Sequence, residues 1–169
     1  ELFMAGEYFP LLDWLVARNK RVFVDLQFFD VPATVAAAVR QLRNRGVTFT
    51  TVHGNQSIME AAAEAKGDVK VLGVTVLTSL DKADLKSTGI GATVENQVAR
   101  LAVLARDAGM DGVVASPLEI ARLRRECGSR FLLVVPGVRS QGDTGDDQKR
   151  VLTPEEAIRA GANYLVIGK

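Results

Sequence analysis

Three polar side chains follow an apolar run in residues 22–35, VFVDLQFFDVPATV. Asp25 and Gln27 are two positions apart, so on a β-strand their side chains point to one face. Asp30 comes after the strand, where Pro32 indicates the first turn of a helix. A carboxylate on an inward face needs a cation or a hydrogen-bond donor beside it, because a buried unpaired charge is costly. The stretch is therefore a candidate catalytic cluster, and the alternative for Asp30 is a helix cap.

A second candidate feature is the polar, glycine-containing segment 136–150, PGVRSQGDTGDDQKR. Such a loop can wrap an anion with backbone N–H groups and with the guanidinium of Arg139, although a solvated surface loop has the same composition. Gly168 and Lys169 follow the last apolar run, at the end of a strand where barrel enzymes frequently hold a phosphate. The two features together favour phosphate binding.

The remaining candidates are single polar residues after apolar runs. His53 is the only histidine, so a histidine metal cluster is excluded, and a hydrogen-bonded structural role competes with acid-base chemistry. Thr78 and Ser79 end the longest apolar run and can hydrogen-bond a ligand or cap the next turn. We expect three aromatic side chains to pack in the core rather than to stack on a ligand: Trp14, Phe28 and Phe29.

Alternating apolar patterns predict the elements that position these residues. Strands are predicted at 21–27, 49–54, 69–77, 112–116, 130–137 and 164–169, and helices at 9–18, 34–46, 56–67, 94–109, 118–127 and 154–161. Capping boxes are predicted from Ser116 to Glu119 and from Thr153 to Glu156. Continuous apolar strands are typical of a parallel sheet, which fits an open doubly wound sheet or part of an eight-stranded barrel. The absence of GxGxxG after the first strand removes the main argument for a dinucleotide fold.

Composition favours one globular domain over residues 1–169, with 47% hydrophobic and 24% charged residues. The 21 basic and 20 acidic residues leave a net charge of +1, which gives no reason to expect nucleic acid or a membrane surface as partner. Cys127 is the only cysteine, so we expect a packed, unreactive thiol and a cytoplasmic location. No apolar run is long enough to span a bilayer, and the first residues lack the order of a signal peptide.

The chain resembles the orotidine 5′-phosphate decarboxylase family over essentially its whole length. The segments that carry the resemblance are VFVDLQFFDVPATV, VHG, LGVTVLTSLDKADL, DGVVASPLE, PGVR, DDQKRVLTPEEAIRAGA and YLVIGK. The resemblance implies an α/β fold, a (β/α)₈ barrel of which about strands 3 to 8 are present, so that the domain is incomplete at both ends. It also implies a homodimer with active sites at the subunit interface and neither a metal nor an organic cofactor. The first lysine of the catalytic set and an early ribose-binding aspartate would lie outside these residues.

For catalysis, the resemblance assigns roles to the opening stretch. Asp25 matches the acid that lies against the substrate carboxylate, and Asp30 matches the acid that reaches the neighbouring subunit's site, with Thr34 nearby. Gln27 occupies the position of the lysine that protonates pyrimidine carbon 6 as carbon dioxide leaves. An amide can donate a hydrogen bond but is not a usable acid near neutral pH.

For binding of orotidine or uridine 5′-monophosphate, the resemblance matches Ser79, with Thr78 beside it, to the strand end that contacts the pyrimidine. Gln148 matches the residue that bridges base and phosphate, and Arg139 matches the loop arginine. Lys169, after Gly168, replaces the phosphate-binding arginine and loses its bidentate geometry.

Three alternative functions are consistent with these residues and with the resemblance. The first is decarboxylation of orotidine 5′-monophosphate to uridine 5′-monophosphate in pyrimidine biosynthesis, strongly impaired by Gln27. The second is a non-catalytic barrel that retains the uridine-phosphate pocket. The third is a magnesium-dependent phosphosugar aldolase or decarboxylase on a related barrel, against which the PGVR and DDQKR segments argue.

Overall fold

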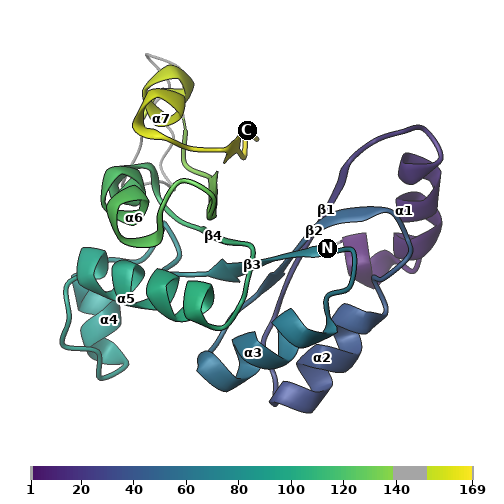
Figure 1. The fold of residues 1–169 in the computed structure, drawn as a ribbon, viewed down its shortest axis with the longest axis horizontal. Helices are drawn as coiled ribbons and strands as arrows, with labels where there is room; N and C mark the ends of the chain where they lie inside the picture. The colour runs from purple at the N-terminus through teal and green to yellow at the C-terminus, as the bar shows by residue number, and fades with distance from the viewer. Residues whose placement is uncertain (1, 139–151, 169) are drawn as a thin grey trace.

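The computed structural model describes residues 2–138 and 152–168, in which one curled sheet contains six parallel strands (Figure 1). The strands are β1 (Val22–Phe28), β2 (Val47–Val52), β3 (Lys70–Val74), β4 (Gly112–Val114), β5 (Leu132–Val135) and β6 (Tyr164–Leu165). Each strand pairs in parallel with the next one along the chain. The six predicted strands are therefore confirmed, although most are shorter than the apolar runs that predicted them.

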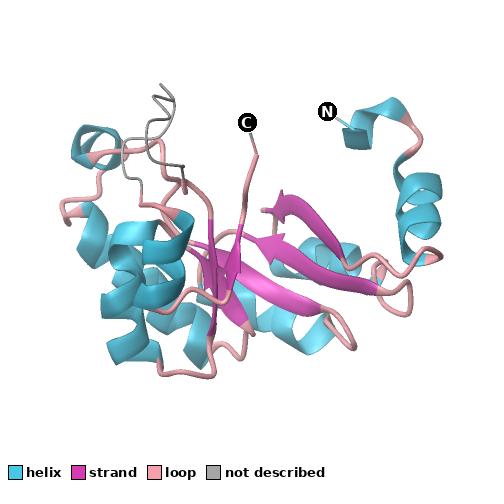
Figure 2. Cartoon of the chain, turned by 90° about the horizontal axis from the view of Figure 1, so that it is seen from above, coloured by secondary structure: helices cyan, strands magenta, loops and turns pink. Residues whose placement is uncertain are grey.

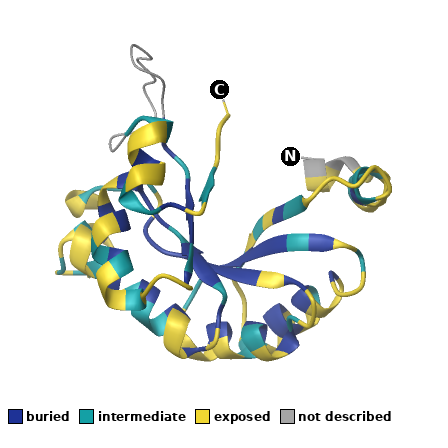
Figure 3. Cartoon of the chain, turned by 45° about the horizontal axis from the view of Figure 1, so that its top comes forward, coloured by how far each residue is buried: buried dark blue, intermediate teal, exposed yellow. Residues whose placement is uncertain are grey.

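Helices connect the strands and lie along the convex face of the curled sheet (Figures 2 and 3). The α-helices are α1 (Tyr8–Val16), α2 (Pro32–Arg40), α3 (Gln56–Ala65), α4 (Lys82–Ser87), α5 (Val94–Asp107), α6 (Ile120–Cys127) and α7 (Pro154–Ala160), and the 3₁₀ helices are η1 (Leu2–Ala5) and η2 (Pro117–Glu119). A doubly wound sheet would place helices on both faces and break the sequential strand order. The arrangement is instead an arc of a (β/α)₈ barrel.

Two apolar layers hold the arc together, one on each face of the sheet. The outer layer is the large core between the sheet and the helices, to which α2, α3 and α5 contribute the faces that carry Val39, Met59 and Ala102. The inner layer is aromatic: the ring of Phe49 lies 5.9 Å from that of Phe23 and 4.9 Å from that of Tyr164. Because Tyr164 belongs to β6 and Phe49 to β2, the sheet curls far enough for distant strands to share an interior, as in a barrel.

Several predicted helix boundaries needed correction. The helix predicted at 34–46 ends at Arg40, and residues 41–43 continue as i to i−3 hydrogen-bonded turns. The capping box at Thr153 and Glu156 is confirmed. At Ser116 the N-cap and the proline that follows it are confirmed, but the helix is 3₁₀: the Ser116 hydroxyl accepts from Leu118 N–H rather than from Glu119 N–H, and Glu119 is buried. The sequence patterns also missed α4, which is too short to show an apolar period.

Gly112 of β4 lies opposite Leu132 of β5, with no room for a side chain. A Cβ at this position would lie 2.2 Å from the Leu132 carbonyl oxygen and 2.6 Å from Leu132 Cβ. We expect Gly112→Ala to lower the free energy of unfolding by about 3 kcal/mol, at the upper end of the usual cost of overpacking, since backbone must move. Urea denaturation of the full-length protein measures this loss.

Gly91 provides the matched control, because a Cβ there would meet nothing within 4 Å. Gly91→Ala should change the free energy of unfolding by no more than about 0.5 kcal/mol. Equal urea midpoints for the two variants would contradict the close approach at Gly112.

Candidate active site

The carboxyl end of β1 contains a bulge. Val24 pairs with Thr50 and Phe28 pairs with Val52, so three residues of β1, 25–27, lie opposite a single residue of β2. Gln27 has a φ of 48°, in the left-handed region that residues other than glycine rarely adopt. Bulges bend a strand and redirect its side chains, and they are frequent beside active sites.

Thr51 is the residue of β2 that faces this bulge. Its Oγ1 donates a hydrogen bond of 2.7 Å to Asp25 Oδ1 and accepts one of 3.0 Å from the backbone N–H of Gln27. The sequence predicted that Asp25 needs a donor, and the Thr51 hydroxyl is that donor. Asp25 itself is exposed rather than buried, so it can meet a ligand from the concave side of the sheet.

Asp25 and Gln27 line a common cavity of about 190 Å³ at the carboxyl ends of the strands. Thr78 adds a third polar side chain, and the apolar walls come from β1, β3, β4 and the segments that follow β3, β5 and β6: Phe23, Val74, Val114, Pro136 and Val166 among others. The prediction that Asp25 and Gln27 share a face is therefore confirmed, although a bulge brings them together. An acid, an amide and a hydroxyl over an apolar floor can orient a planar polar ring.

The phenol of Tyr8, in α1, lies close enough to Asp25 for the carboxylate to affect its pKa. Burial, and secondly the carboxylate of Asp25, raise the pKa of the Tyr8 phenol above its ordinary value. The phenol therefore stays protonated at neutral pH and keeps its hydroxyl donor.

Three other predicted residues lie outside the cavity. Asp30 is exposed and its Oδ1 accepts a 2.6 Å hydrogen bond from Val31 N–H, but the N-cap of α2 is Val31, which corrects the capping interpretation of Asp30. Thr34, in the first turn of α2, is exposed, and so is Ser79. Thr78 and Ser79 do not end a strand, because β3 stops at Val74 and these two residues form a turn in which Leu80 N–H donates to the Leu77 carbonyl oxygen.

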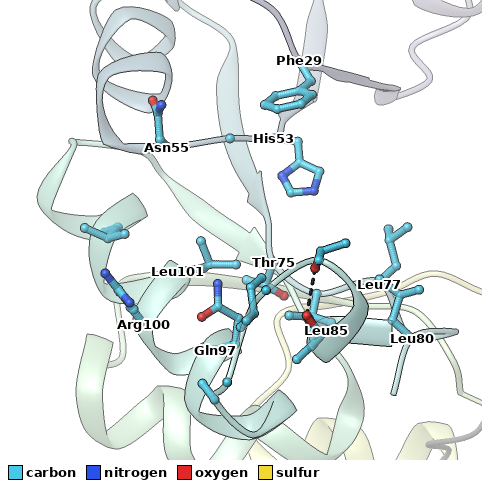
Figure 4. Close-up of a pocket in the computed structure, with 18 residues that line it drawn as sticks. Phe29, His53, Asn55, Thr75, Leu77, Leu80, Leu85, Gln97, Arg100 and Leu101 are labelled. Atoms are coloured by element: carbon cyan, nitrogen blue, oxygen red, sulfur yellow. Dashed lines mark hydrogen bonds between the residues drawn. The ribbon is translucent and has the colours of Figure 1, made fainter. Parts of the chain in front are cut away.

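A second, larger cavity of about 700 Å³ lies beside the first (Figure 4). Phe29 and His53 face it from the ends of β1 and β2, and Gln97 and Arg100 face it from α5. Among the described residues, no group hydrogen-bonds the buried Nδ1 of His53, and burial lowers the pKa of this imidazole. No described residue therefore supports the hydrogen-bonded role predicted for His53 at Nδ1. No sequence pattern indicated this cavity, because its polar residues come from separate elements.

The aromatic predictions were correct for only one residue of three. Phe28 packs against the core, but Phe29 is 69% exposed and Trp14 is 50% exposed, with the Arg18 guanidinium 3.9 Å from its ring centroid. Phe29 lies 5.4 Å from the His53 ring, so it belongs to the surface around the second cavity.

Part of the predicted phosphate site lies outside the described residues, namely Arg139, Gln148 and Lys169. Gly168 is exposed after β6, and a Cβ there would meet nothing within 4 Å. In residues 2–138 and 152–168, no three His, Cys, Asp or Glu side chains come together as metal ligands. Over the same ranges, every helix is too short or too polar to cross a membrane.

An arc of sequential parallel strands, helices on its outer face and polar groups at the carboxyl strand ends define part of a (β/α)₈ barrel with a cavity at the barrel mouth. The chain belongs to the orotidine 5′-phosphate decarboxylase / HUMPS family, whose model matches residues 1–169. The sequence-based prediction of the family is confirmed.

Individual relatives agree with this assignment. The orotidine 5′-phosphate decarboxylase of Methylococcus capsulatus is 52% identical over 170 residues, which cover all of this chain and 70% of that protein. The protein of the same name from Xanthomonas campestris pv. campestris is 47% identical over 171 residues, with the same coverage. The crystal structure of orotidine 5′-phosphate decarboxylase from Lactobacillus acidophilus superposes with a TM-score of 0.81 at 31% identity, covering 95% of this chain and 71% of that one. An uncharacterized conserved protein from Geobacillus kaustophilus gives a TM-score of 0.82, also at 31% identity.

Proposed function

We propose that the protein binds orotidine 5′-monophosphate and decarboxylates it to uridine 5′-monophosphate in pyrimidine biosynthesis, at a rate strongly reduced by Gln27. The observation that carries this proposal is the pairing of Asp25 and Gln27 in one cavity at the carboxyl strand ends. The chain that presents them is 52% identical to a protein named for this reaction.

The reaction breaks the bond between pyrimidine carbon 6 and the carboxylate, releases carbon dioxide and requires a proton at carbon 6. Asp25, held by Thr51, is the group that would face the substrate carboxylate. Gln27 takes the position of the proton donor, where its amide can hydrogen-bond the ring but cannot protonate carbon efficiently. General acid catalysis is typically worth about 10² to 10⁴ in rate, which is the scale of the defect.

Substrate binding depends less on position 27. Thr78 lines the cavity and would contact the pyrimidine together with Ser79. Arg139, Gln148 and the pair Gly168 and Lys169 would hold the phosphate. Retention of these groups supports a second candidate, a non-catalytic barrel that binds uridine 5′-monophosphate, which the replacement of lysine by Gln27 specifically favours.

The exposed residues after β1 support a homodimer. Phe29 is 69% exposed and Val31 is 61% exposed, and these two large apolar side chains flank Asp30. Apolar side chains exposed together are frequent at protein interfaces. A second copy of the chain packed here would receive Asp30 and Thr34 at its own active site.

A cytoplasmic location is supported by the state of Cys127. The thiol is half-buried against the core, as expected from its isolation in the sequence, and burial raises its pKa. It therefore stays a protonated, unreactive thiol, which suits a reducing compartment.

Isothermal calorimetry with uridine 5′-monophosphate tests binding directly. We expect the full-length protein to bind with a Kd below about 1 mM, that is, more favourably than about −4 kcal/mol. Thr78→Val should weaken binding about fivefold, because one hydrogen bond is worth about 1 kcal/mol. Thr48→Val, near the amino end of β2, is the control and should leave Kd unchanged. The absence of any binding heat would overturn both candidates.

A further inference from the structure

The bulge in β1 leaves two groups of the site without their usual strand partners. Residues 25–27 face only one residue of β2, so regular pairing does not fix the Asp25 side chain or the backbone at position 27. One hydroxyl replaces that pairing, since Thr51 Oγ1 bonds both groups. A hydroxyl has a single proton, so its donation to the carboxylate leaves only lone pairs for the Gln27 N–H, and the two bonds are compatible.

We propose that Thr51 is a positioning residue for the decarboxylase site. Its hydroxyl fixes the orientation of the Asp25 carboxylate and the position of the backbone from which the side chain at position 27 reaches the substrate. This inference rests on the proposed function. Thr51 is fully buried, so water does not compete for its two hydrogen bonds. The residue touches no substrate and acts through Asp25 and position 27.

The adjacent residue, Thr50, shows what a purely structural threonine looks like on the same strand. Thr50 is also fully buried, and its Oγ1 donates a 3.0 Å hydrogen bond to the Val24 carbonyl oxygen. That bond joins β1 to β2 before the bulge and involves neither Asp25 nor Gln27. Thr50→Val is therefore a matched control for Thr51→Val, because each removes one buried hydroxyl from β2.

Kinetics in a Gln27→Lys background test the catalytic consequence. A misplacement of about 1 Å can cost about 100-fold in rate, so we expect Thr51→Val to lower kcat by about 10- to 100-fold with a smaller change in KM. Thr51→Ser keeps the hydroxyl and should recover most of the rate, and Thr50→Val should stay within about twofold. A kcat for Thr51→Val that falls no further than that of Thr50→Val would overturn the proposal.

Amide hydrogen exchange at position 27 gives a readout that needs no turnover. In the unmodified protein, loss of the acceptor in Thr51→Val should speed exchange of this N–H at least about tenfold relative to Thr50→Val, and Thr51→Ser should not. Unchanged exchange would also overturn the positioning role. If the Gln27→Lys parent neither decarboxylates the substrate nor binds uridine 5′-monophosphate, the proposed function fails. The exchange rate of the position 27 N–H would still show whether Thr51 positions that backbone.

Discussion

Replacing Gln27 with lysine is expected to raise kcat for decarboxylation of orotidine 5′-monophosphate by about 10² to 10⁴-fold. The position already has what a lysine needs. Gln27 is exposed in the cavity that Asp25 also lines, so a longer side chain has space and a carboxylate beside it. The φ of 48° is no harder for lysine than for glutamine, because both are unbranched at Cβ. An ammonium adds the transferable proton that the amide lacks and a counter-charge for the acid.

Two control variants separate the contributions of proton, charge and size. Gln27→Met is unbranched and uncharged, and should give no gain. Gln27→Arg restores the charge without a readily released proton, since the guanidinium stays protonated in proteins, so it should leave binding in place but recover little turnover. Steady-state assays of the full-length protein, with Kd for uridine 5′-monophosphate measured in parallel, distinguish the three outcomes. If kcat of Gln27→Lys equals that of the unmodified protein, position 27 is not the position of the proton donor.

The fold was predictable from the sequence because burial in a parallel sheet leaves a strong compositional pattern. Each apolar run marked a real strand, but the run at 69–77 is longer than β3, which ends at Val74. Thr75 and Val76 are buried without extending the strand, because they form walls of the cavities at its carboxyl end. An apolar run indicates which residues are buried, but it does not indicate which of them pair with a neighbouring strand. This is why boundaries at the functional edge of the sheet were the least accurate.

The site was predictable where residue type and position in a strand carried the information. Asp25 and Gln27 were found because polar groups that end a buried strand are unusual. Thr51 was missed, although it holds Asp25, because it lies 26 residues away and reads as one of several β-branched residues in β2. The bulge that brings the three together depends on pairing between strands, which no local pattern records. Phe29 was misplaced because its hydrophobicity predicts burial, whereas its place after β1 leaves it exposed.

Arg124 is expected to be the residue whose loss most destabilises the carboxyl half of the arc. Its guanidinium donates to the carbonyl oxygens of Gly128, Phe131 and Gly161, at 3.0, 2.5 and 2.7 Å, and to Asn163 Oδ1. Gly128 and Gly161 are the C-caps of α6 and α7, whose carbonyls the helix ends leave unpaired, and Phe131 precedes β5, so one side chain bonds both helix ends and the sheet. Burial lowers the pKa of Arg124, but the group remains charged at neutral pH.

Arg124→Met keeps much of the aliphatic length of this side chain but removes every donor, which should lower the free energy of unfolding by about 2 to 4 kcal/mol because the partly buried carbonyls of Phe131 and Gly161 lose their partner. Arg124→Lys restores a charge but not the planar fork, so it should recover less than half of the loss. Arg125, the exposed neighbour on α6, gives the control, and Arg125→Met should stay within about 0.5 kcal/mol. Urea denaturation of the full-length protein followed by circular dichroism measures all three. If Arg124→Met unfolds at the same urea concentration as Arg125→Met, the carbonyls around Arg124 are satisfied by other donors and the residue does not hold the helices to the sheet.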